Sequence, residues 1–93
     1  MIMLLAFSAQ LFSASFDCNK AASLPEMMIC NDTELSRFDD ELSVIYQEAK
    51  AAATDEQNFK QQTEAAWKWR EKNCQTKECL ISWYSNRKEP GQG

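Results

Sequence analysis

The sequence predicts a small all-α fold, an antiparallel helical hairpin or bundle with short flanking helices and two disulfide bonds. Glycine, which interrupts helices, occurs only twice in the 93 residues. The clearest apolar pattern repeats every three or four residues, which is the spacing of one helix face. Four cysteines are present. A single domain of this length has a marginal core and usually needs cross-links.

Residues 1–15 are predicted to form a signal peptide. Residues 1–14 carry no charge, and their apolar run is too short to span a bilayer as a helix. Small residues favour cleavage after Ala14 or after Ser15, although Phe12 fits the first of these sites poorly. We therefore expect a periplasmic or secreted protein with no stable membrane insertion once this segment is removed.

A short first helix is expected from about Pro25 to Cys30. Ser23 or Leu24 would cap it, and Pro25 suits its first position because the N–H that proline lacks is not needed there. A longer second helix should follow, with Asn31 as its cap in a capping box. An apolar seam at spacings of three and four residues marks the buried face of this helix: Leu35, Phe38, Leu42, Ile45, Ala49 and Ala52.

The third helix is expected over residues 55–73, where Thr54 and Gln57 form a second capping pattern. Only Ala53 and Thr54 separate it from the second helix, so the two helices should fold back antiparallel. Its inward stripe is expected to contain Phe59, Thr63, Ala66, Trp67, Arg70 and Cys74.

Thr76 is expected to cap a fourth helix, and residues 89–93 are expected to form a flexible tail. Asp39 lies beside the apolar seam of the second helix. It should pair with Arg70 or Arg87 from a neighbouring helix, which would fix the register of the bundle. The fourth helix carries Cys79, Leu80, Trp83, Tyr84 and Arg87.

The four cysteines allow three pairings. Cys18 and Cys30 bracket the stretch before the long helix. Cys74 and Cys79 bracket the turn between the third and fourth helices, so we expect two local bridges. They would contribute roughly 3 and 2 kcal/mol to the stability of an exported domain.

Metal and redox chemistry are disfavoured at these cysteines. Zinc ligands usually come in pairs about two to four residues apart, which these spacings do not match, and histidine is absent. A redox pair usually has about two intervening residues, whereas Cys74 and Cys79 have more. Catalysis is not expected either, because the chain offers no histidine base and no glycine-rich phosphate loop.

A small cationic and aromatic spot is the candidate partner-binding site. Trp67 lies on the core stripe, whereas Trp69, two positions further on, points to another side of the helix. Lys68 and Arg70 flank Trp69, and tryptophan and arginine are enriched at interface hot spots. The alternative is that Trp69 only covers the alkyl stems of its neighbours.

A set of residues between positions 16 and 87 occurs in a characteristic order: Phe16, Asp17, Cys18, Ala21, Glu26, Ile29, Cys30, Leu35, Asp39, Leu42, Tyr46, Gln62, Trp67, Cys74, Cys79, Leu80, Tyr84 and Arg87. In this respect the stretch of residues 16–88 resembles the LprI-type lysozyme inhibitor family of small secreted bacterial proteins. In one departure, Arg70 stands one place before the usual arginine position, which falls on Glu71. The resemblance implies a helical domain with two disulfides and, as for the family's namesake, inhibition of lysozyme.

The expected function is therefore that of an exported, non-enzymatic binding protein whose partner is lysozyme or another cell-wall hydrolase. The alternative is an envelope structural or interaction protein without inhibitory activity. No cofactor or metal is expected. The net charge of −4 argues against nucleic acid as a partner, because phosphates call for a basic surface.

Overall fold

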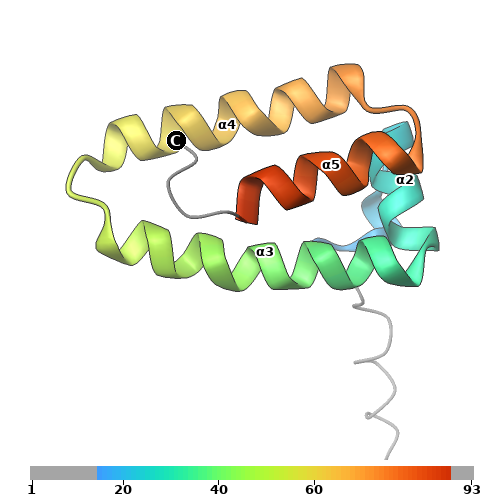
Figure 1. Cartoon of the computed structure of the whole chain (residues 1–93), viewed down its shortest axis with the longest axis horizontal. Coiled ribbons are helices and arrows are strands. Elements are labelled where there is room, and N and C mark those ends of the chain that lie inside the picture. The colour runs from blue at the N-terminus through green and yellow to red at the C-terminus, as the bar shows by residue number, and fades with distance from the viewer. Residues whose placement is uncertain (1–14, 89–93) are drawn as a thin grey trace, which may run out of the picture.

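The computed structural model describes residues 15–88, and this part of the chain contains helices and no strand (Figure 1). The all-α prediction is confirmed. The predicted signal peptide, apart from Ser15, and the predicted tail at residues 89–93 lie outside the described residues. The elements in chain order are a 3-10 turn η2 (Cys18–Lys20) and the helices α2 (Leu24–Asn31), α3 (Thr33–Ala52), α4 (Glu56–Asn73) and α5 (Lys77–Lys88).

The start of α2 is held by a capping box, and Ser23, one of the two predicted caps, is the residue that caps it. The hydroxyl of Ser23 accepts a hydrogen bond from the Glu26 backbone N–H at 3.1 Å. The Glu26 carboxylate in turn accepts one from the Ser23 backbone N–H at 3.2 Å. Two backbone donors that the first helical turn leaves without partners are thereby satisfied.

The caps of α3 and α4 fall one residue after the predicted positions. Asp32 and Asp55, rather than Asn31 and Thr54, accept the backbone N–H three residues on, at 3.1 and 3.0 Å. Helix α2 continues through Asn31, so the chain leaves helical geometry only at Asp32. Both caps are carboxylates, which the positive end of a helix dipole favours. Thr76 caps the first turn of α5 as predicted, accepting from a backbone N–H at 3.1 Å.

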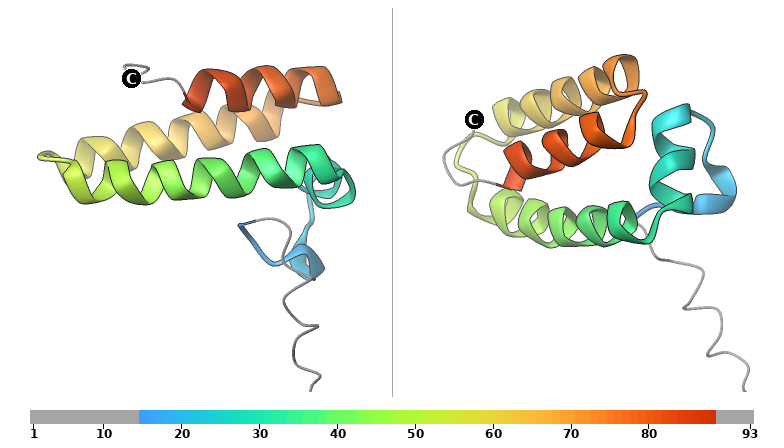
Figure 2. Two further views of the ribbon diagram at one scale, coloured as in Figure 1. Left: turned by 60° about the horizontal axis from the view of Figure 1, so that its bottom comes forward. Right: turned by 45° about the vertical axis from the view of Figure 1, so that its right-hand side comes forward.

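Helices α3 and α4 run antiparallel, as predicted, but α5 lies between them along one side of the pair (Figures 1 and 2). Helix α5 packs against α3, and α2 packs against α3 and α4 at the end where α3 begins and α4 ends. Direct packing between α3 and α4 is sparse. Two long helices held apart in this way leave space between them on the side that α5 does not cover.

The core lies at the α2 end of the bundle. Of the predicted apolar seam of α3, Leu35 is buried, whereas Ala49 and Ala52 at its far end are exposed, so the seam is buried only over its first part. The exposed end follows from the shorter length of α5, which stops at Lys88 and does not reach the α3–α4 turn (Figure 1). The fully buried apolar residues are Ile29, Leu35, Cys74, Leu80 and Tyr84.

Both predicted disulfide bonds are present. Cys18–Cys30 joins η2 to α2, with the two Cα atoms 5.8 Å apart. Cys74–Cys79 joins the end of α4 to the first turn of α5, with a Cα–Cα distance of 5.2 Å. Cys18–Cys30 thus fastens η2 to the flanking helix α2, and Cys74–Cys79 fastens α5 to the end of the α3–α4 hairpin. Such cross-links are expected in a domain of this size.

Candidate binding groove

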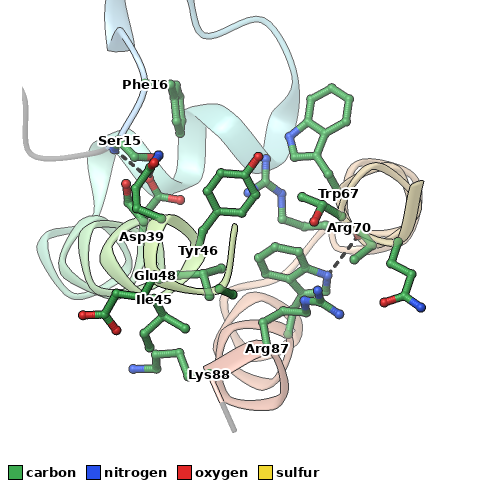
Figure 3. Close-up of a pocket in the computed structure, with 18 of the residues that line it drawn as sticks. Ser15, Phe16, Asp39, Ile45, Tyr46, Glu48, Trp67, Arg70, Arg87 and Lys88 are labelled. Carbon is green, nitrogen blue, oxygen red and sulfur yellow. Dashed lines mark hydrogen bonds between the residues drawn. The ribbon is translucent and has the colours of Figure 1, made fainter. Parts of the chain in front are cut away.

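A groove of about 1080 Å³ runs between α3 and α4, with α5 along its base (Figure 3). The segment of Ser15 and Phe16 lies at one end of it. The remaining lining is mainly apolar, and the large side chains that supply it are Leu42, Ile45 and Tyr46 from α3, Phe59 and Trp67 from α4, and Trp83 from α5. We name this feature the α3–α4 groove.

Aromatic rings from three helices shape the α3–α4 groove. The rings of Tyr46 and Phe59 lie 5.3 Å apart and bridge α3 and α4. Trp83 is held in place from α5, since its indole N–H donates to the backbone oxygen of Ala66 at 3.1 Å. Trp67 is 44% exposed, and its ring faces the groove (Figure 3). A concave surface of aromatic side chains with partly exposed rings is the kind of surface that binds a ligand or a protein side chain.

Where Asp39 and Arg70 line the groove, a buried hydrogen-bond cluster joins α3, α4 and α5. The Tyr84 hydroxyl donates to Asp39 Oδ1 at 2.6 Å and accepts from Arg70 Nη1 at 3.4 Å. Arg70 also forms an ion pair with Glu71, with Nη2 and Oε2 2.7 Å apart. Its guanidinium carbon lies 5.1 Å from the centre of the Trp83 ring. Within residues 15–88 every buried side-chain nitrogen and oxygen has a hydrogen-bond partner, so the cluster serves packing and register.

Burial raises the pKa of Tyr84 well above its ordinary value of 10, and the neighbouring charge of Asp39 raises the pKa further. Below pH 10 this tyrosine is neutral in both the folded and the unfolded chain. Above pH 10 the unfolded chain releases the proton first, so the contribution of this group to stability is lost as the pH rises.

We therefore expect Tyr84 to lower the free energy of unfolding by about 1 kcal/mol between pH 10 and pH 11, with the slope approaching roughly 1.4 kcal/mol per pH unit above that. Urea unfolding at pH 9, 10 and 11, followed by circular dichroism, measures this slope. The Tyr84→Phe variant should show a slope smaller by about that amount, because lysine titration remains in both proteins. Equal slopes in the two proteins would contradict the assignment.

Positive side chains lie along one edge of the groove. Arg87 and Lys88, at the end of α5, line it (Figure 3). Lys88 Nζ lies 2.8 Å from Glu41 Oε1 and 4.4 Å from the centre of the Phe38 ring. The hydrogen bond from Lys88 lowers the pKa of Glu41. The groove thus combines an apolar floor with charged side chains of both signs, since Glu48 lines it as well as Arg87 and Lys88, and Lys88 is already paired with Glu41.

The three residues predicted to bind a partner do not form one surface. Lys68 is exposed and Trp69 is 52% exposed, whereas Arg70 is only 3% exposed and points into the bundle. Consecutive helical residues point about 100° apart, so a buried Arg70 places Trp69 on the outer side of α4. Lys68 and Trp69 remain together as an exposed pair, away from the α3–α4 groove.

Two other expectations about these side chains were wrong. Trp67 is not a core residue, because α3 and α4 are too far apart for its ring to be covered from the other helix. Asp39 is buried, but it forms no ion pair with Arg70 or Arg87 among the described residues; its partners are Tyr84 and Ser15. Trp67 lies on the expected inward stripe and Asp39 beside the apolar seam. The spacing of apolar residues does not predict where α5 or Ser15 lies, and these positions decide the surroundings of both side chains.

Within the part of the chain that the structure describes, no cluster of three or more potential metal ligands occurs. All four cysteines are in disulfide bonds. None of the helices in residues 15–88 combines the length and hydropathy that a bilayer-spanning segment requires.

The fold and the groove define a small, disulfide-bonded all-α domain with an open, largely apolar groove. In comparisons with models of protein families, with curated proteins and with solved structures, nothing matches the chain.

Proposed function

We propose that the chain is an exported, non-enzymatic binding protein that inhibits lysozyme or a related cell-wall hydrolase. The observation that carries the proposal is the α3–α4 groove, in which a small domain leaves aromatic side chains open to solvent. Large apolar patches on a small domain usually mark an interaction site. The resemblance of residues 16–88 to the LprI-type inhibitors suggests that the partner is lysozyme or a related hydrolase.

Disulfide bonding supports the exported part of the proposal. Bridges such as Cys18–Cys30 and Cys74–Cys79 persist in oxidising compartments and are rare in the cytosol of most cells. The uncharged N-terminal stretch at residues 1–14 resembles the apolar h-region of a signal peptide. The periplasm or the cell exterior is therefore the proposed location.

Charge supports the choice of a basic hydrolase. The chain has a net charge of −4, which attracts a basic protein over distances of about 10 Å and speeds encounter. At the contact itself, Arg87 at the groove edge can meet the carboxylates that glycoside hydrolases use, whereas Lys88 is engaged with Glu41. The net negative charge of the chain would thus attract the hydrolase from a distance, while a basic side chain at the groove would contact its carboxylates.

A turbidity assay tests this function directly. Purified mature protein, mixed with lysozyme at equimolar concentration before cell walls are added, should slow the fall in turbidity. A complex should also be measurable by calorimetry, and it should weaken as the salt concentration rises. Undiminished lysis together with the absence of a complex would rule the proposal out.

Two tryptophans two positions apart on α4 provide matched variants for locating the contact. Trp67 faces the α3–α4 groove and Trp69 the outer side, and both are about half exposed. Trp67→Ala should raise the Kd for the hydrolase about 10- to 100-fold, as at an interface hot spot, while Trp69→Ala leaves it nearly unchanged. The reverse result would place the contact on the exposed pair of Lys68 and Trp69.

The second candidate is an envelope interaction protein without inhibitory activity. Leu24 and Met27 favour it, because both are exposed, lie three residues apart on α2, and are separate from the groove. If the protein does not inhibit hydrolases but binds an envelope partner through this face, the Met27→Asp variant should no longer bind that partner. Its thermal stability should be unchanged, because Met27 is exposed.

A further inference from the structure

The buried carboxylate of Asp39 is held by Ser15, the first residue that the structure describes (Figure 3). Asp39 Oδ2 accepts a hydrogen bond from the Ser15 backbone nitrogen at 2.7 Å and another from the Ser15 hydroxyl. Its other oxygen, Oδ1, accepts from the Tyr84 hydroxyl at 2.6 Å. Asp39 is only 6% exposed, and no ion pair of residues 15–88 includes it.

A buried carboxylate that no cation contacts directly is unfavourable, since the hydrogen bonds that it accepts replace only part of its hydration. The guanidinium of Arg70 reaches Asp39 only through the Tyr84 hydroxyl. The residue that approaches Asp39 stands at the predicted end of the signal peptide. Hydrolysis of the Ala14–Ser15 peptide bond would turn the Ser15 nitrogen into an amino group. An α-amino group has a pKa of about 7.7 to 8.0, so it is largely protonated at neutral pH.

We propose that the Ala14–Ser15 bond is the processing site, and that the new α-ammonium group of Ser15 forms an ion pair with Asp39. A signal peptidase would add one water across this bond, leaving a carboxylate on Ala14 and an amine on Ser15 that takes up a proton. The Ser15 nitrogen already lies 2.7 Å from Asp39 Oδ2, which is ion-pair distance, so the new positive charge would form beside the Asp39 carboxylate. This inference rests on the export that the proposed function includes.

The sequence allows two cleavage sites, and Phe12 counts against the one after Ala14, whereas the geometry favours that site. Cleavage after Ser15 would remove both of its donors from Asp39 and leave a chain that begins at Phe16. Cleavage after Ala14 retains both donors and adds a charge. Phe16 lines the end of the α3–α4 groove, and Cys18 is bonded to α2. The N-terminal segment would thus be fixed at two points, by the Cys18–Cys30 disulfide and by the ion pair between Ser15 and Asp39. These two bonds would hold Phe16 at its end of the groove.

The first test determines the N-terminus of the exported protein. The full chain would be expressed in a Gram-negative host, and the periplasmic fraction would be analysed by intact mass and N-terminal sequencing. The expected first residue is Ser15. A protein that begins at Phe16, or elsewhere, would overturn this inference while leaving export intact. A protein retained in the cytoplasm at full length would overturn export as well.

The second test measures the ion pair itself. All the contacts described above lie within residues 15–88, so a chain that begins at Ser15 contains the whole described fold. Acetylation of its α-amino group should lower the Tm by about 5–10 °C. The same acetylation in the Asp39→Asn variant should change the Tm little, because the charge that it pairs with is gone. An equal effect of acetylation in both backgrounds would overturn the pair.

A variant with one extra N-terminal glycine tests the ion pair even if Asp39→Asn does not fold. One glycine added before Ser15 keeps a free ammonium group but moves it one residue away from Asp39. Its Tm should match that of the acetylated protein. A Tm equal to that of the chain that begins at Ser15 would show that the position of the ammonium group is immaterial and would overturn the inference.

Discussion

Replacing Tyr84 with alanine should lower the free energy of unfolding by about 3–5 kcal/mol, which is most of the stability expected of a domain this small. Tyr84 is fully buried at the centre of the core. Its ring packs edge-on against Trp83, with centroids 5.0 Å apart, and lies 6.3 Å from Phe38. Alanine would leave a cavity between α3 and α5 and would remove the hydrogen bond to Asp39.

The hydroxyl and the ring contribute separately, and Tyr84→Phe separates them. Phenylalanine keeps the ring but removes the group that donates to Asp39 and accepts from Arg70. Because the Asp39 carboxylate is buried, the loss of this donor should cost about 1–3 kcal/mol. The remainder of the alanine effect then belongs to packing.

Urea unfolding followed by circular dichroism measures both variants, and Tyr46→Phe is the matched control. Tyr46 lies at the α3–α4 groove with its ring against Phe59, so phenylalanine keeps that contact and should change stability by less than about 0.5 kcal/mol. If Tyr84→Phe were as stable as the wild type, the buried cluster would contribute nothing to folding, contrary to its geometry.

Local signals in the sequence were sufficient to predict the helices and the cross-links. The spacing of apolar residues predicts α3 and α4, and their short connection predicts the antiparallel hairpin. The local pairing of four cysteines was correct. The caps Asp32 and Asp55 were each missed by one residue, because Asn31 and Thr54 have the same capping chemistry and only the end of the preceding segment decides between them.

The groove and the Asp39 cluster depend on tertiary placement, which local patterns do not contain. Helix α5 lies between α3 and α4, and this arrangement leaves Trp67 partly exposed and buries Arg70. Asp39 meets Tyr84 from 45 positions further along the chain and Ser15 from 24 positions before it. The one available signal was Asp39 itself, a carboxylate next to an apolar seam, which indicates a buried partner without identifying it.

Removing both disulfide bonds should leave the chain largely unfolded at 37 °C. The bridged cysteines are separated by 12 and 5 positions, and loop-closure entropy assigns them about 3 and 2 kcal/mol. The sum of about 5 kcal/mol is comparable with the whole stability of a small domain. Circular dichroism during heating, with and without a reductant, measures the effect. A Tm that is unchanged on full reduction, verified by intact mass, would contradict it.

Loss of each disulfide bond should increase hydrogen exchange in a different part of the fold. Replacing both cysteines of one bridge with alanine tests each bridge separately. Without Cys18–Cys30, η2 loses its covalent link to α2, so backbone amides in residues 15–21 should exchange with solvent much faster while those in α3 and α5 stay protected. Cys74 is fully buried in the core, so loss of Cys74–Cys79 should raise exchange in α4 and α5 as well. Hydrogen exchange by mass spectrometry distinguishes these patterns. If both paired variants exchanged alike throughout, the bridges would be acting only on the unfolded chain, and neither would be a local clamp.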